Sequence, residues 1–215
     1  MLPFSREAFL SVIVDYNQAI WPAQIVAYLV GLAAIGALVW RKPFSDRAIA
    51  GALAAMWLVT GAAYHAMFFT AINPAAYLFA AAFILEAGVL VYCGMFRGQL
   101  RFGFDGSPAA WVGAAFLAYA GLAYPLLAIA TGHAYPELPM FGLTPCPVTI
   151  FTFGLFLMTT QRVPRVLFVI PFLWSLVGGS AAFLLNIVPD WFLLASGVIA
   201  LAMLLPRDRL RAMAA

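Results

Sequence analysis

Seven long apolar runs divide this chain of 215 residues, and short polar segments separate them. Each run has about 15–23 residues, close to the ~20 that cross the hydrocarbon core of a membrane as a helix. The pattern predicts an all-α integral membrane protein, built as a bundle of seven transmembrane helices in a single membrane domain over residues 1–215. The predicted helices cover residues 20–40, 48–70, 75–96, 109–131, 146–160, 166–185 and 191–205.

Positive charge is confined to alternate gaps between these runs. Ten of the eleven Lys and Arg residues lie there, and the gaps 71–74, 132–145 and 186–190 contain neither residue. Because cytoplasmic loops retain Lys and Arg, the pattern predicts an N-terminus outside and a C-terminus in the cytoplasm. The ten residues are Arg41, Lys42, Arg47, Arg97, Arg101, Arg162, Arg165, Arg207, Arg209 and Arg211.

The composition agrees with this pattern and excludes other classes. The chain is 66% hydrophobic and 9% charged, with a mean hydropathy of +1.01, whereas soluble domains carry about 25% charged residues. Seven spans leave no room for a soluble domain. The net charge of +3 and the pI near 9.1 come from the inner loops, and no basic stripe with interleaved aromatic residues predicts nucleic-acid binding.

The two ends of the chain are predicted to lie outside the bilayer. Residues 1–19 have the pattern of an amphipathic helix on the outer surface, with Ser5 as N-cap and an apolar face of Phe9, Leu10, Ile13 and Val14. Residues 206–215 form a basic cytoplasmic tail. The cysteines Cys93 and Cys146 are expected at opposite depths of the membrane, too far apart for a disulfide.

Weak internal similarity suggests a parallel repeat of three helices on each side of a linker helix, a 3+1+3 arrangement. The second and sixth helices share Trp-x-x-x-Gly, from Trp57 and from Trp174. Chance is a serious alternative, since Trp and Gly are common in membrane helices. The fifth helix is short and follows Thr144-Pro145-Cys146-Pro147, so it is expected to begin as irregular backbone, tolerated at depth where protein or a wet cavity surrounds it.

Glu86 is the residue whose burial in the bilayer is most costly. It lies near the middle of the third helix, where a carboxylate needs a proton, a partner or water. We expect it at the base of a polar pocket open to the outer face, binding a ligand or relaying protons. The alternative is a protonated side chain making one structural hydrogen bond, and His65 has a similar alternative. The predicted pocket residues are Gln24, Tyr28, Tyr64, His65, Glu86, Thr149 and Ser180.

A second hypothesis is a soft-metal site at the outer rim. Cys146 lies between two prolines, and thiolate and thioether sulfur suit Cu(I). The candidate metal ligands are Cys146, His65, Met67 and Met140. The alternative is a rigid helix start with a small buried thiol. Asn73, Asn186 and Asp190 border the outer gaps, and turn roles are favoured over ligand roles there.

Three segments carry a resemblance to a known family: Tyr16-Asn17-Gln18 with Trp21-Pro22-Ala23-Gln24, residues 141–147, and residues 171–180. Thr-Pro-Cys-Pro and Trp-Ser-Leu-Val-Gly-Gly-Ser are the most specific parts. Together they resemble an uncharacterised family of bacterial multi-pass membrane proteins, a domain-of-unknown-function family. The resemblance implies a bacterial cytoplasmic (inner) membrane location and assigns no activity and no catalytic residue.

The expected function is therefore binding or transport of a small solute or ion within the lipid bilayer. The alternatives are the copper-type site and a non-catalytic subunit with a membrane-protein partner or a second copy of the chain. An enzyme is the least supported class, since there is no nucleophile elbow or phosphate loop. No cofactor is identified.

Overall fold

The computed structural model describes residues 2–213, apart from the side chains of residues 209–213, and every regular element within that part is a helix. The α-helices are α1 (Arg6–Ala19), α2 (Ala23–Trp40), α3 (Ser45–Val59), α4 (Ala76–Leu90), α5 (Pro108–Ala118), α6 (Tyr124–Ala130), α7 (Pro145–Leu157), α8 (Val166–Leu185) and α9 (Trp191–Met213). Three π-helical segments, Thr60–Phe68, Val91–Phe96 and Tyr119–Ala123, extend α3 and α4 and join α5 to α6. Short 3-10 turns cover Phe69–Ala71 and Val188–Asp190.

Six continuous helical segments are long and apolar enough to cross a membrane. They are Ala23–Trp40, Ser45–Ala71, Ala76–Phe96, Pro108–Ala130, Val166–Leu185 and Val188–Asp208. The predicted fifth span is different. Its helix, α7, has only 13 residues, or about 20 Å at 1.5 Å per residue, against a hydrocarbon core of about 30 Å. Seven full-length spans are therefore not confirmed. The fifth helix is short, as expected, but Pro145, Cys146 and Pro147 form a regular first turn after an extended Thr144, so the irregular start that was expected for it is wrong.

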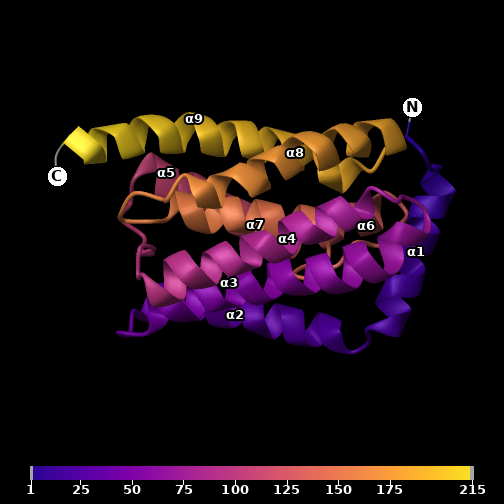
Figure 1. Ribbon diagram of the computed structural model, residues 1–215, viewed down its shortest axis with the longest axis horizontal. Helices are drawn as coiled ribbons and strands as arrows, with labels where there is room; N and C mark the ends of the chain where they lie inside the picture. The colour runs from indigo at the N-terminus through magenta and orange to yellow at the C-terminus, as the bar shows by residue number, and fades with distance from the viewer. Residues whose placement is uncertain (1, 214–215) are drawn as a thin grey trace.

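Successive long helices run in opposite directions, as Figure 1 shows. The loops with Arg41, Arg97 and Arg162 consequently lie at one end of the bundle, on the left of Figure 1. We call this the basic end. At the opposite end, α1 lies across the ends of the other helices instead of alongside them.

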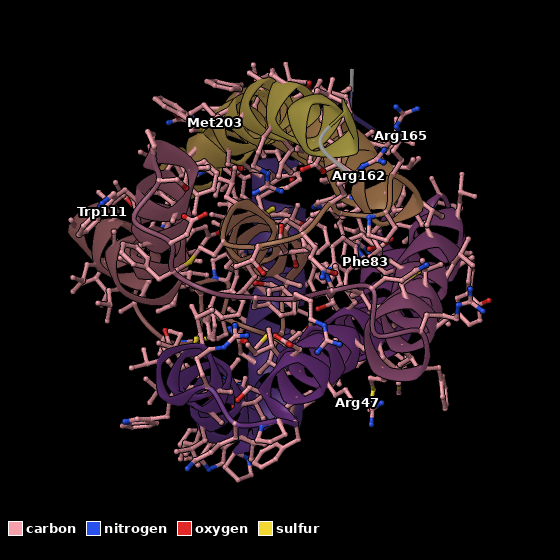
Figure 2. All side chains as sticks on the ribbon, turned by 90° about the vertical axis from the view of Figure 1, so that its left-hand side faces the viewer. Arg47, Phe83, Trp111, Arg162, Arg165 and Met203 are labelled. Carbon is pink, nitrogen blue, oxygen red and sulfur yellow. The ribbon has the colours of Figure 1, made fainter. Side chains whose placement is uncertain are left out.

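The centre of the bundle is occupied by α7, which the other helices surround (Figure 2). All of its residues are buried, and it packs against α5, α9, α8 and α3. The approach to α5 is closest at a pair of glycines. A Cβ atom on Gly113 would lie 2.6 Å from the Gly154 carbonyl oxygen, and one on Gly154 would lie 2.9 Å from the Gly113 oxygen. Small residues permit such backbone contact between membrane helices.

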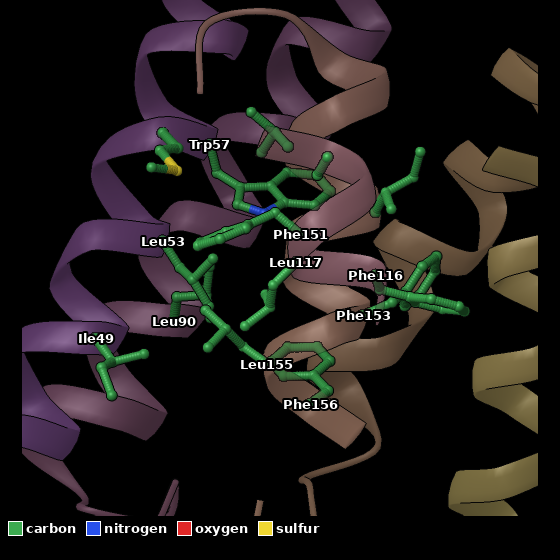
Figure 3. Packing of buried hydrophobic residues seen from close by; sticks show 14 of the residues in the cluster. Ile49, Leu53, Trp57, Leu90, Phe116, Leu117, Phe151, Phe153, Leu155 and Phe156 are labelled. Carbon is green, nitrogen blue, oxygen red and sulfur yellow. The ribbon is translucent and has the colours of Figure 1, made fainter. Parts of the chain in front are cut away.

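Large apolar side chains fill the space between α7 and its neighbours (Figure 3). Ile49, Leu53 and Trp57 of α3 face Phe151 and Leu155 of α7, with Leu90 and Leu117 beside them. One polar link crosses this interface, from the Trp57 indole Nε1, which donates to Thr152 Oγ1 at 2.9 Å. Because lipid is as apolar as this core, such packing and hydrogen bonding hold the helices together.

The last carbonyl groups of α7 are satisfied by an arginine from another helix. The last four C=O groups of a helix have no intrahelical partner. Arg207 of α9 donates from Nη1 to the Leu157 oxygen at 3.0 Å and from Nη2 to Thr159 Oγ1 at 2.9 Å. Its Nε donates to Asp208 at 2.9 Å. Arg207 thus compensates the negative end of the α7 dipole.

Asp46, in the first turn of α3, organises the rest of the basic end. Its Oδ1 accepts a hydrogen bond from the Phe102 N–H at 2.8 Å, and its Oδ2 accepts one from Arg101 at 3.2 Å. Arg41 is a more distant partner, with 3.7 Å between Nη1 and Oδ1. This buried carboxylate therefore joins α3 to the segment after α4.

The structure changes the predicted ends of the chain. Helix α9 continues to Met213, so residues 206–213 extend the last helix instead of forming a separate tail. Residues 214–215 and the side chains of Arg209 and Arg211 lie outside the described part. At the other end Ser5 is the N-cap of α1, since its Oγ accepts from the Ala8 N–H at 3.2 Å.

The packed face of α1 differs from the predicted one. Val12, Ile13, Tyr16 and Asn17 are its buried residues, whereas Leu10 and Val14 are only partly buried. The predicted face was an apolar strip for a lipid surface. The actual face includes polar side chains because α1 packs on protein.

The 3+1+3 repeat stays a prediction. It would relate α2 to α7, and these two helices have different surroundings. Only 28% of the α2 span is buried, whereas α7 is enclosed along its whole length.

Replacing Arg207 with Met tests the arginine at the α7 C-terminus. The substitution keeps most of the apolar stem but removes every donor, so buried carbonyl groups lose their partner. We expect a loss of about 2 kcal/mol in the free energy of unfolding, measured by thermal unfolding in detergent. Arg165→Met, at an exposed position, removes the same charge and should change stability little. Equal effects of the two variants would contradict the assigned role.

Candidate functional site

A small cavity lies at the end of the bundle opposite the basic end, where α1 covers the start of α7. Its volume is about 50 Å³, enough for a few water molecules at 10–15 Å³ each. We call it the acidic cavity because Asp190 lines it. The other lining residues come from α1 and the segment before it (Phe4, Phe9, Ile13), the end of the α3 span (Tyr64, Phe69), the loop before α7 and the first turn of α7 (Pro139, Thr144, Pro145, Cys146), α8 (Trp174, Gly178, Ala181, Ala182, Leu185) and Ile187.

Asp190 is the charged group of this cavity. Its side chain is buried, with 3% exposed, and its Oδ1 accepts a hydrogen bond from the hydroxyl of Tyr124, which is fully buried on α6. The carboxyl group also interacts with the thiol of Cys146. A 3-10 turn places Asp190 directly before α9, with its own N–H bonded to the Ile187 oxygen at 3.0 Å.

The positive end of α7 faces the same cavity. Thr144, in extended conformation, precedes the helix, and Pro145, Cys146 and Pro147 form its first turn. Proline is favoured in a first turn because the N–H groups there lack intrahelical partners. A helix N-terminus carries about half a positive charge. The start of α7 therefore brings this charge inside the bundle, beside a carboxylate.

An aromatic cluster lies next to the acidic cavity and encloses His65. The His65 ring has its centroid 4.7 Å from that of Phe83 and 5.1 Å from that of Trp174. Tyr64, Phe69 and Phe79 complete the cluster. Neither ring nitrogen of His65 has a hydrogen-bond partner within the described residues.

Two neighbouring residues of a π-helical segment both face inward. Tyr64 and His65 lie in Thr60–Phe68, and both are buried. Tyr64 lines the acidic cavity, while His65 enters the aromatic cluster. Segments of π-helix are rare and occur frequently at functional sites.

Glu86 lies deeper in the bundle, on the buried face of α4. Its side chain is fully buried, and neither carboxyl oxygen has a hydrogen-bond partner within the described residues. It is ten residues beyond the start of α4 at Ala76, about 15 Å along the helix axis. It does not line the acidic cavity. The structural alternative was a protonated Glu86 that forms one hydrogen bond to a neighbouring helix. No such bond is present among the described residues.

Helix α1 and the loop before α7 form the roof of the acidic cavity and are fixed to each other. The Tyr16 hydroxyl donates to the Leu143 oxygen at 3.0 Å, and Asn17 Nδ2 donates to the Leu138 oxygen at 2.9 Å. Burial raises the pKa of Tyr16 well above its ordinary value, so this hydroxyl stays a donor at neutral pH. Arg6 contacts His133 Nε2 at 2.8 Å.

The structure brings only part of the predicted pocket together. Tyr64 lines the acidic cavity, and His65 and Glu86 lie in the interior beside it or beneath it. Gln24 is buried under α1 and donates to the Asn17 oxygen at 2.8 Å. Tyr28 faces away, toward a groove between α2 and α5. Thr149 Oγ1 donates to the Pro145 oxygen at 2.8 Å within α7, and Ser180 is exposed on α8.

The candidate soft-metal ligands are also dispersed. Met67 is 72% exposed, and Met140 packs beside α1. Cys146 lines the acidic cavity, whereas His65 does not. Within the described residues, no group of three or more His, Cys, Asp and Glu side chains could hold a metal ion. Copper binding through the four residues stays a prediction.

Sequence reasoning missed Asp190, Tyr124 and Trp174 as site residues. Asp190 was expected in a turn, and it is in one, but its side chain points inward. Its signal was available, since it is the only acidic residue of the gap 186–190 and directly precedes an apolar run. Tyr124 and Trp174 carried no signal, because aromatic residues are frequent throughout the chain.

Comparison with protein-family models identifies the family of this chain. A model described as DUF6064, a family of unknown function, matches residues 6–215. The chain belongs to this family. The predicted relation to an uncharacterised family is thereby confirmed, and the match includes α1, the start of α7 and Asp190. Comparisons with curated proteins and with solved structures gave no match.

Tyr124→Phe tests the hydrogen bond to Asp190. The variant keeps the ring but leaves a buried carboxyl oxygen without its donor, so we expect the free energy of unfolding to fall by about 1–3 kcal/mol. The measurement is thermal unfolding in detergent. Tyr119→Phe is the matched control, since that hydroxyl donates to the Pro189 oxygen at 2.8 Å in a partly buried position. A larger loss for the control would contradict the assignment.

Proposed function

We propose that this membrane protein binds and conducts protons or another small cation, with Asp190 at the entrance and Glu86 in the interior. One observation carries the proposal. Both carboxyl groups are buried, and neither forms a salt bridge with a Lys, Arg or His side chain within the described residues. An acidic group inside a membrane protein costs about 3 kcal/mol on insertion scales unless it is compensated.

The surroundings of the two carboxyl groups differ, and this supports separate roles. Asp190 has a hydroxyl donor from Tyr124 and the positive end of α7 nearby, which favour a charged carboxylate. Glu86 has no donor at all within the described chain. A carboxylate at the entrance attracts cations, while a group without partners is stable in the interior only with a bound proton or cation.

Aromatic side chains lie between the two groups. Trp174 lines the acidic cavity, and its ring contacts His65. His65 contacts Phe83, which lies three residues before Glu86 on α4, about 4.5 Å along the helix axis. Aromatic rings bind cations on their faces, and histidine transfers protons. The cavity volume of about 50 Å³ suits hydrated ions or protons and excludes large solutes.

The orientation that we propose follows from charge. Seven segments cross the bilayer, with α7 and the buried chain before it completing the fifth crossing. The basic end faces the cytoplasm and the acidic cavity faces outward, as the distribution of Lys and Arg favours. We assign the protein to a bacterial cytoplasmic membrane on the family resemblance.

Proton flux into proteoliposomes tests the mechanism. A potassium gradient with valinomycin drives protons inward, and a trapped dye reports the internal pH. We expect flux well above that of protein-free liposomes, with a loss of tenfold or more in Asp190→Asn and in Glu86→Gln, because each variant removes a carboxylate that accepts the cation. Parallel assays with sodium, potassium and methylammonium gradients identify the ion.

Asp15→Asn is the control, since it removes an exposed acid from α1, and it should conduct like wild type. Thermal unfolding of each variant establishes that the fold is retained. The mechanism is wrong if folded Asp190→Asn and Glu86→Gln both conduct like wild type. It is equally wrong if wild type conducts none of the four cations above the background of protein-free liposomes.

The orientation is tested with reporters in a bacterial host. Green fluorescent protein fused after Ala215 should fluoresce, because it folds in the cytoplasm and not after export in unfolded form. Alkaline phosphatase fused at the same place should be inactive. A cysteine at exposed Gln18 should react with an impermeant thiol reagent added to cells, and active phosphatase would reverse the assignment.

A further inference from the structure

A second cavity, distinct from the acidic cavity, is a groove on the side of the bundle. Its volume is about 820 Å³, at the upper part of the 300–1,000 Å³ range of small-molecule sites. It lies between α2 and the α5–α6 span, with Phe141 and Phe151 at its base. We call it the lateral groove. Its walls are Tyr28, Gly31, Leu32, Ile35, Leu38 and Val39 on one side and Ala114, Leu117, Ala118, Gly121 and Leu122 on the other.

Charge is found only at one end of the lateral groove. Arg41, Gly103, Phe104, Met158 and Thr160 form that end, and it belongs to the basic end of the bundle. The Arg41 guanidinium lies over Gly103, where a Cβ atom would come within 3.2 Å of Nη1. The Arg41 side chain is 45% exposed, and it forms an ion pair with Asp46, with 3.7 Å between Nη1 and Oδ1. Asp46 lies closer to Arg101, at 3.2 Å, so it neutralises the charge of Arg41 only weakly. Arg41 is therefore available to bind another anion.

The groove is long enough to cover a lipid chain across one leaflet of a bilayer. Tyr28 and Arg41 are thirteen residues apart along α2, which corresponds to about 20 Å of helix. Half of a hydrocarbon core is about 15 Å. A chain that begins at the level of Arg41 would therefore be covered along its length. Small residues deepen the wall at Gly121, where a Cβ atom would meet nothing within 4 Å.

We propose that the lateral groove binds an acyl chain of an anionic phospholipid, with the phosphate against Arg41. The apolar walls suit the chain, and the cation at the membrane surface suits the headgroup. The site requires no cation conduction and goes beyond the function proposed above.

The same charge argues against a protein occupant. A transmembrane helix from another protein, or a second copy of this chain in the same orientation, brings its own cytoplasmic Lys and Arg to the level of Arg41. Like charges there would repel. An anionic headgroup is complementary, and phospholipids with this charge are abundant in the cytoplasmic leaflet.

Native mass spectrometry of the purified full chain tests the proposal with phosphatidylglycerol and phosphatidylcholine as probes. We expect one phosphatidylglycerol to bind to wild type at least tenfold more tightly than phosphatidylcholine. Gly121→Leu fills the groove and should weaken binding of both lipids tenfold or more. Gly88→Leu is the matched control, because that helical glycine on α4 also has open space around it, and it should bind like wild type.

Arg41→Gln separates the headgroup from the chain. It should remove the preference for phosphatidylglycerol while leaving binding of phosphatidylcholine unchanged, whereas Arg165→Gln, which removes an exposed charge elsewhere at the basic end, should keep the preference. Wild-type affinity in folded Gly121→Leu overturns the site. Equal affinity of wild type for the two lipids overturns the headgroup assignment. A wild-type dimer that Gly121→Leu converts to a monomer identifies a second copy as the occupant and overturns the proposal.

Discussion

The unpaired backbone N–H and C=O groups at the two ends of α7 lie inside the bundle and need partners there. The remaining structure depends on this constraint. In a hydrocarbon environment each unpaired backbone group costs several kcal/mol, and α7 is too short to bring both ends to water. At the C-terminus of α7, Arg207 donates hydrogen bonds to the last carbonyl groups. At the N-terminus two prolines remove N–H groups that would need partners. The positions of α9 and of the loop before α7 follow from these requirements.

The same constraint produces the acidic cavity. A helix that begins inside the bundle places its positive end where no water is guaranteed, and Asp190 with Tyr124 supplies the opposite charge and a hydrogen bond beside it. Helix α1 then covers this region through Tyr16 and Asn17. The polar groups that distinguish this end are therefore consequences of the short central helix.

Much of the fold could be predicted from the sequence, because hydropathy and charge report depth in a membrane directly. Residues 166–185 form the helix predicted for them, and α7 is short, as its apolar run indicated. The prolines predicted irregular backbone at its start, but they form the regular first turn instead. The rotation of each helix about its own axis could not be predicted in this way. Helices that are apolar all round give no moment to show which face is buried, so Ser180 was expected inside and is exposed. The local π-helix at Tyr64 and His65 also had no sequence signal.

The start of α7 separates the two cavities and contacts both. Phe141, in the loop before α7, lines the lateral groove and packs on Tyr28 and Phe151 with ring centroids 5.1 Å apart in each case. Three residues later Thr144 lines the acidic cavity. Because interiors are close-packed and deform in discrete steps, a displacement of Phe141 by an acyl chain would be transmitted to the turn that positions Cys146 beside Asp190. Lipid in the groove and a cation in the cavity would therefore act on opposite sides of one short segment, and the thermodynamic coupling between them would be reciprocal.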